Sequence, residues 1–246
     1  PGVWLASRVK SCRLLEMADV VIIDETSRLF QGCTPRYVFA FGCAPKRGKV
    51  HRSRRRQERN KGKPVNPEVV IRGETDADID AVTGVTVAAF QPLEISNHTE
   101  QFIIAALRVA KALPVSLVAE VDGRVIGHIA FSPVTISDGT QNWYGLGPVS
   151  VLPAYQRQGI GKALIREGLS RLKDMNAQGC CLVGHPDYYR KFGFKNMSGL
   201  VLVGVPQEVF LALSFDGHDA QGTVTFHEGF KADGQPEGAG NALQRA

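Results

Sequence analysis

Two glycines two residues apart, Gly159 and Gly161, stand where an apolar stretch gives way to an amphipathic one. A strand is expected over about 142–151 and a helix over about 160–175. Glycines in such a connection let the backbone approach an anion, and the first amides of the helix point outward with its positive dipole end. The pattern indicates a pyrophosphate-binding loop made of Gln156, Arg157, Gln158, Gly159, Ile160, Gly161 and Lys162.

Two common phosphate-binding loops do not fit these residues. A P-loop requires glycine at 156 and Ser or Thr at 163, where the chain has Gln156 and Ala163. A dinucleotide fingerprint, GxGxxG, requires a third glycine at the position of Leu164. The pattern that does fit is Gln/Arg-x-x-Gly-x-Gly.

That pattern resembles motif A of the GNAT superfamily of N-acetyltransferases. Residues 188–194, YYRKFGF, resemble the family's motif B, and residues 149–153 resemble its fourth strand and the exit from it. Three further stretches are similar to the YhbS-like branch of the superfamily, namely 145–151 (GLGPVSV), 184–186 (GHP) and 222–227 (GTVTFH). The resemblance covers about 68–232.

The resemblance implies that acetyl-CoA is the co-substrate and that its acetyl group passes directly to a primary amine of a small molecule or a protein. The loop and helix start would bind the pyrophosphate, and the thioester carbonyl would lie against the backbone of Val149, Ser150 and Val151. Fixed N–H donors aimed at a developing oxyanion contribute about 3 kcal/mol each. Pantetheine would lie where this strand splays from the next one. Tyr189 occupies the position where many family members keep a general acid for the leaving thiolate.

The general base is left open among His128, His185 and Glu94, each of which also suits a structural or solvated role. Cys180 and Cys181 lie in an apolar stretch and are expected to be small hydrophobic residues, not nucleophiles. The histidines and cysteines show no metal-ligand spacing, so no metal is expected.

The remaining pattern predicts an α/β (α+β) domain with the GNAT fold, a mixed central sheet of about six to seven strands flanked by helices. A hairpin is expected across Asp122-Gly123, and a capping box is expected at Thr75–Asp78. The other expected elements are a strand at 69–72, helices near 79–89, 99–112 and 187–192, and strands at 180–183, 200–203 and 223–226. Substrate choice is expected to come from 78–112 and from the late strands.

The chain has 246 residues, of which 43% are hydrophobic, so it can form a substantial core. No apolar run reaches the ~18 residues that span a bilayer, and no secretory signal is recognised. We expect a cytoplasmic protein with no membrane partner.

The net charge of +5 is unevenly distributed, because residues 1–66 carry 15 Lys and Arg against 5 Asp and Glu. Three parts are expected: a basic leader (1–66) that is disordered or non-native, a GNAT domain (67–235) and a flexible tail (236–246). Residues 18–25 resemble a Walker B strand, but no phosphate loop precedes them. The basic run at 46–56 suits either a solvated linker or nucleic-acid phosphates.

Two alternative functions stay open. One is a nucleic-acid-associated protein that uses the basic leader, and the other is a GNAT domain that binds acyl-CoA without turnover. The identity of the amine and the formation of a homodimer are also left open.

Overall fold

The computed structural model describes residues 68–94 and 96–234. The leader expected at 1–66, its strand at 18–25, its basic run at 46–56 and the tail expected at 236–246 lie outside the described residues. Their boundaries and roles therefore stay predictions.

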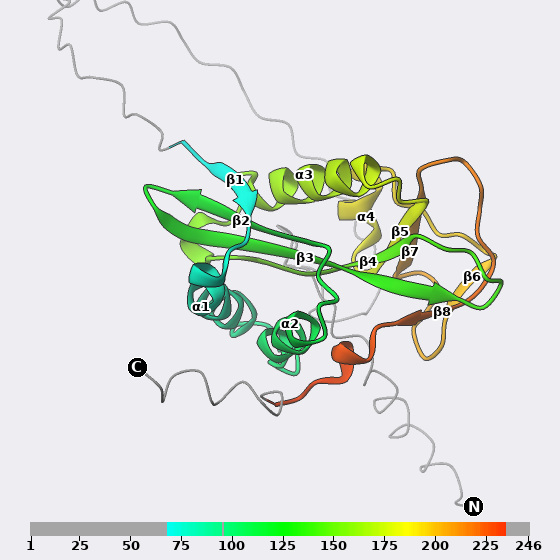
Figure 1. Ribbon diagram of the computed structural model, residues 1–246, viewed down its shortest axis with the longest axis horizontal. Coiled ribbons are helices and arrows are strands. Elements are labelled where there is room, and N and C mark those ends of the chain that lie inside the picture. The colour runs from blue at the N-terminus through cyan, green and yellow to red at the C-terminus, as the bar shows by residue number, and fades with distance from the viewer. Residues whose placement is uncertain (1–67, 95, 235–246) are drawn as a thin grey trace, which may run out of the picture. The chain divides into compact units, whose positions relative to one another are not determined.

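An eight-stranded mixed sheet forms the centre of the described domain (Figure 1). Six strands follow in the order β1-β2-β3-β4-β5-β7, while β8 pairs with the far end of β3, and β6 pairs with β8. The β4–β5 and β6–β8 pairs are parallel, and the others are antiparallel. The strands are β1 (Val70–Gly73), β2 (Val115–Val121), β3 (Arg124–Ile136), β4 (Trp143–Val151), β5 (Gly179–Val183), β6 (Leu200–Leu202), β7 (Phe210–Ser214) and β8 (Gly222–Phe226).

The expectation of about six to seven strands was too low, because β7 has no strand signal that the sequence analysis recognised. Leu211 of β7 packs into the core on one face of the sheet, while Phe210 and Ala212 pack into the core on the other. Both faces are covered here, so the strand reads as a short apolar run without polar alternation.

Helices cover both faces of the sheet. Figure 1 shows α1 (Ile79–Phe90) and α2 (Glu100–Val109) on one face, and α3 (Ile160–Asp174) and α4 (Pro186–Tyr189) on the other. Four short 3₁₀ turns complete the elements: η1 (Asp76–Asp78), η2 (Pro153–Tyr155), η3 (Arg190–Phe192) and η4 (Glu228–Lys231). None of the helices in the described part of the chain is long and apolar enough to cross a membrane.

Two local predictions are confirmed at the start of the domain. Thr75 and Asp78 form the capping box, in which the Thr75 amide donates to the Asp78 carboxylate at 2.8 Å. The β2–β3 turn has positive φ at both Asp122 (49°) and Gly123 (78°), as a type I′ turn requires.

The two adjacent cysteines behave as expected. Cys180 and Cys181 are fully buried on opposite faces of β5, each in a hydrophobic cluster. Burial raises the pKa of both thiols, which disfavours the thiolate. They are therefore core residues.

Candidate functional site

β4 leaves its parallel neighbour halfway along its length. It pairs with β5 only from Trp143 to Gly145, whereas its antiparallel pairing with β3 continues to Val151. Between the pairs Leu146–Phe131 and Val149–Ile129, β4 has one residue more than β3, which is a β-bulge. The bulge contains Gly147-Pro148, and Pro148 has no N–H to donate to a ladder. From Leu146 onward, the edge of β4 that faces β5 is therefore no longer paired with it.

The ladder with β3 fixes which β4 amides face that open side. The Leu152 amide donates to the Ile126 carbonyl at 2.9 Å. Because antiparallel pairs alternate in their hydrogen bonding, Ser150 also faces β3, while Val149 and Val151 point their N–H and C=O groups away from it. In agreement, the Val151 carbonyl accepts a bond at 3.0 Å from the Gln156 side chain.

Ser150 differs from its two neighbours in both backbone and side chain. Its hydroxyl is buried on the α1 face of the sheet, 3.2 Å from the hydroxyl of Thr86. Of the three residues predicted to contact the thioester, Val149 and Val151 therefore face the gap. Ser150 instead connects β4 to β3 through its backbone and to α1 through its hydroxyl.

The loop after β4 is held by two glutamine side chains. Gln156 bonds back to Val151, and Gln158 donates to the Ala154 carbonyl at 3.1 Å. Gly159, in the left-handed region at φ 87°, caps α3, and a side chain there would meet nothing within 4 Å. The Ala163 amide bonds back to Gly159, so the amides of Ile160 and Gly161 have no acceptor within the helix. Among the predicted pyrophosphate contacts, Arg157 and Gln158 are exposed, and Ile160 is buried.

An aromatic cluster lies between β5 and α3. Tyr189 is fully buried against Tyr188 and Phe194, with ring centroids 5.1 and 5.8 Å away, and its ring lies 2.6 Å from where a Cβ on Gly184 would sit. It therefore packs where β5 ends. Tyr188 is also in the core, and its hydroxyl lies 3.3 Å from a Cβ built on Gly161. Glycine at 161 thus lets Tyr188 approach the first turn of α3.

One of the three candidate bases belongs to a buried polar cluster under α2. His128 is fully buried, and its Nε2 lies 2.8 Å from the Ser116 hydroxyl and 3.4 Å from the Glu74 carboxylate. Glu74 is also bonded to Ser116 and paired with Arg108 of α2. Burial lowers the pKa of His128, so its neutral form is favoured. Burial alone would raise the pKa of Glu74, but His128, Ser116 and Arg108 outweigh it and lower that pKa to about 2.

The other two candidates lie elsewhere. His185 directly precedes α4, and its Nδ1 is buried with no partner among the described residues. Glu94 is exposed in the loop between α1 and α2. The structure therefore does not bring the three candidate bases together.

A cavity of about 490 Å³ opens beside the ends of β5, β6 and β8. Phe226 borders it and packs its ring on Gly145, the last β4 residue paired with β5, where any side chain would overlap the ring. Val183, which borders it from β5, lies two residues beyond the same pair. The lining residues are Asn97, Thr99, Val183, Leu202, Val203, Thr223, Val224, Thr225, Phe226, His227, Phe230, Lys231, Ala232 and Asp233.

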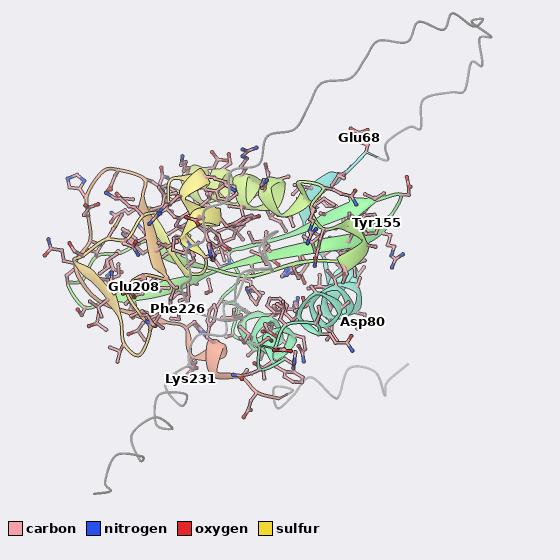
Figure 2. The ribbon with its side chains drawn as sticks, turned by 180° about the vertical axis from the view of Figure 1, so that it is seen from behind. Glu68, Asp80, Tyr155, Glu208, Phe226 and Lys231 are labelled. Carbon is pink, nitrogen blue, oxygen red and sulfur yellow. The ribbon has the colours of Figure 1, made fainter. Side chains whose placement is uncertain are left out.

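Most of these lining residues carry no sequence pattern of their own and fall only within the broad regions expected to determine substrate choice. In Figure 2, Phe226 and Lys231 lie together near one end of the sheet, and Tyr155, in the loop before α3, lies near the other. Only the 222–227 stretch carried a signal, through its family resemblance. Within the described ranges, no group of three or more His, Cys, Asp or Glu residues is placed to hold a metal ion.

Comparisons with known proteins bear on this arrangement. The profile of the "Acetyltransferase (GNAT) domain" family matches residues 114–196. The "Uncharacterized N-acetyltransferase YhbS" of Escherichia coli (strain K12) is 31% identical over 128 residues, which are 52% of this chain and 74% of YhbS.

Two solved structures are similar to the chain. A GNAT family acetyltransferase from Brucella melitensis in complex with acetyl-CoA is 49% identical, with a TM-score of 0.60, covering 67% of this chain and 99% of that protein. E. coli YhbS in complex with CoA is 28% identical, with a TM-score of 0.63, covering 70% of this chain and 97% of that one. The chain therefore belongs to the GNAT family of N-acetyltransferases.

Proposed function

We propose that this chain binds acetyl-CoA between β4 and β5 and transfers its acetyl group directly to a primary amine held in the cavity beside β8. The observation that carries the proposal is the parting of β4 from β5 after Gly145, with a bulge beside it and a glycine-capped helix beyond. The Brucella relative, 49% identical over nearly its whole length, was crystallised with acetyl-CoA, which supports the same co-substrate here.

In this proposal the backbone does most of the co-substrate binding. The pyrophosphate lies at the first turn of α3, where amides without helical acceptors and the helix dipole favour an anion. Pantetheine follows β4 back toward the bulge, and the outward amides of Val149 and Val151 are its hydrogen-bonding edge. Gln156 contributes by fixing the loop to the end of β4.

The transfer requires stabilisation of an oxyanion, loss of a proton from the amine nitrogen and supply of a proton to the leaving sulfur. A neutral amine nitrogen attacks the thioester carbon, and the negative charge that develops on the carbonyl oxygen is stabilised by a β4 amide. The C–S bond then breaks, the nitrogen releases a proton to solvent, and the CoA thiolate takes one. Tyr189, packed where β5 ends, is proposed as the group that supplies the proton to sulfur.

Calorimetric titration of acetyl-CoA into the full chain tests the co-substrate site, with Gly159→Asp compared with Gly159→Asn. Both side chains tolerate the left-handed backbone at φ 87°, and they have nearly the same shape, but only Asp adds negative charge at the proposed pyrophosphate site. We expect micromolar binding by the wild type and binding by Gly159→Asp at least tenfold weaker than by Gly159→Asn. No binding by the folded wild type, or equal affinities of the two variants, would overturn the proposed site.

A further inference from the structure

We propose that the cavity selects a primary monoamine carried on an apolar body, with His227 donating a hydrogen bond to an acceptor group on that body. This inference rests on the proposed function, because it names the class of amine that receives the acetyl group. It depends on where the cavity lies, what lines it and how the His227 ring is held.

The cavity begins where the thioester is proposed to lie. Gly145 of β4 and Cys181 of β5 form the last pair before the two strands part. The Phe226 ring packs on Gly145, and Val183 lies two residues beyond Cys181 on β5. Both side chains also line the cavity. An amine bound there therefore lies beside the point at which the strands part, within reach of an acyl group at the bulge.

Half of the lining residues are apolar, and apolar atoms provide most of the exposed surface of the cavity. Phe226 and Phe230 form an edge-to-face pair with ring centroids 5.0 Å apart, and five aliphatic residues add to them, namely Val183, Leu202, Val203, Val224 and Ala232. A volume of about 490 Å³ lies within the range of about 300–1,000 Å³ that is usual for small-molecule sites. The apolar walls suit an aryl or alkyl body.

Charge in the lining is balanced and therefore does not favour a polycation. One acidic residue, Asp233, and one basic residue, Lys231, line the cavity. Glu100 follows the lining residue Thr99, but its carboxylate accepts a bond from Ser96 at 2.5 Å, and it does not line the cavity. Polyamines and aminoglycosides need several carboxylates to offset the loss of hydration.

An apolar site also helps to generate the nucleophile. Desolvation disfavours an ammonium ion and lowers the pKa of a bound amine, so more of it is neutral and able to attack. A monoamine meets this condition with one desolvated charge, whereas each further ammonium group on a substrate adds to the cost of entry.

His227 is held as a hydrogen-bond donor. Its Nδ1 accepts a bond from the Gly229 amide at 3.0 Å, so the proton of the neutral ring is on Nε2. Nε2 is then the ring's remaining polar atom, and no described residue bonds to it. It can donate to an oxygen or ring nitrogen on the substrate, but in this tautomer it cannot accept the amine's proton. His227 is thus a recognition residue and not the general base.

The test is an acetylation assay on the full chain, with CoA release measured for 2-phenylethylamine, tyramine, hexylamine, spermidine and a lysine-containing peptide. We expect kcat/KM for the best apolar monoamine to exceed that for spermidine and for the peptide at least tenfold. A preference for spermidine or the peptide, or acetyl-CoA binding with no apolar monoamine acetylated, would overturn the inference. If acetyl-CoA itself does not bind, the proposed function fails instead, so the two failures are distinguishable.

Val203 provides a matched charge test, because it lines the cavity and is 66% exposed, so substitution there spares the core. Val203→Asp should shift the ratio of kcat/KM values toward spermidine at least fivefold relative to Val203→Asn. Val201→Asp adds the same charge on β6, two residues earlier and outside the lining, and should leave the ratio unchanged. Equal shifts in Val203→Asp and Val201→Asp would contradict recognition inside the cavity.

His227→Asn tests the donor while preserving an acceptor for the Gly229 amide. We expect KM for tyramine to rise about three- to tenfold, with kcat and the pH profile unchanged and KM for 2-phenylethylamine nearly constant. A general base at this position would instead show as a fall in kcat and a lost limb of the pH profile. That result, or equal KM changes for the two amines, would overturn the role of His227.

Discussion

The two halves of the proposed active site are built in different ways. The proposed acetyl-donor side consists of β4, the loop after it and the first turn of α3, which together form one continuous stretch from Trp143 to Lys162. The amine side consists of the cavity lining, which comes from the α1–α2 loop, β5, β6, β8 and η4. The donor side offers mainly backbone groups, whereas the amine side offers mainly side chains.

This difference matches the two ligands. Backbone amides recognise a pyrophosphate and a thioester whatever the neighbouring side chains are, so the donor side can stay constant while its sequence changes around the glycines. Side chains such as His227 and Val203 can be replaced singly without disturbing the donor side. The architecture therefore separates a fixed co-substrate from an amine that can vary.

The largest expected effect is on kcat and comes from Tyr189, which is proposed to protonate the CoA thiolate. Tyr189→Phe keeps the ring packed against Tyr188 and Phe194 and removes only the hydroxyl. We expect kcat to fall by about 10²- to 10⁴-fold, the usual worth of general acid–base catalysis, with the Kd of acetyl-CoA unchanged. Steady-state kinetics and calorimetry on one preparation measure both. Unchanged kcat would remove Tyr189 from the chemistry.

The same contrast explains what could be predicted from the sequence. The proposed donor side is contiguous and contains residue types with special backbone behaviour, such as Gly159 at φ 87° and Pro148 in the bulge, so local pattern and family resemblance were enough to predict it. The β3–β4 register determines that Val149 and Val151 face the gap and that Ser150 bonds to β3. No local sequence pattern contains this register, so these roles could not be predicted.

The amine side could be predicted only as two broad regions. Asn97, Val183, Val203 and His227 are far apart in sequence and meet only because β8 folds back onto the end of β3 and β6 adds to it. β7 was missed for a related reason, since its burial on both faces depends on neighbours that the sequence does not name.

The buried cluster under α2 should make the amine side sensitive to acid. The pKa of Glu74 is lowered to about 2, against an ordinary value of 4.5, so its stabilising contribution is complete above about pH 4.5 and is lost as the pH falls toward 2. The loss amounts to about 3 kcal/mol, since one pKa unit is worth about 1.4 kcal/mol. Urea unfolding at several pH values should show this decline, and Glu74→Gln should flatten it in that window.

The same variant distinguishes the two halves at neutral pH. Glu74 anchors Arg108 of α2, and the loop leading into α2 supplies Asn97 and Thr99 to the cavity. Glu74→Gln should therefore raise KM for the amine several-fold and leave the Kd of acetyl-CoA within about twofold. An equal change in both would mean that the cluster supports the whole domain and not the amine side.

A smaller effect is expected where the two sides touch, at the contact of Gly145 with the Phe226 ring. Gly145→Ala forces the ring toward the cavity, and such overpacking costs about 1–3 kcal/mol. We expect thermal stability to fall and KM for the amine to rise, and we expect the losses from Gly145→Ala and Phe226→Ala to be less than additive in the double variant. Additive losses in the double variant would show that the ring is not what a side chain at 145 meets.

The smallest effect belongs to Gly84, an exposed position inside α1 where a Cβ would meet nothing within 4 Å. Because glycine in a helix loses more backbone freedom on folding than alanine does, Gly84→Ala should stabilise the domain by about 0.5–1 kcal/mol. Chemical denaturation measures the gain, and neither the Kd of acetyl-CoA nor KM for the amine should change. α1 packs on both β3 and β4, so a change in either constant would show that the two sides are coupled through this helix and that the separation between them is incomplete.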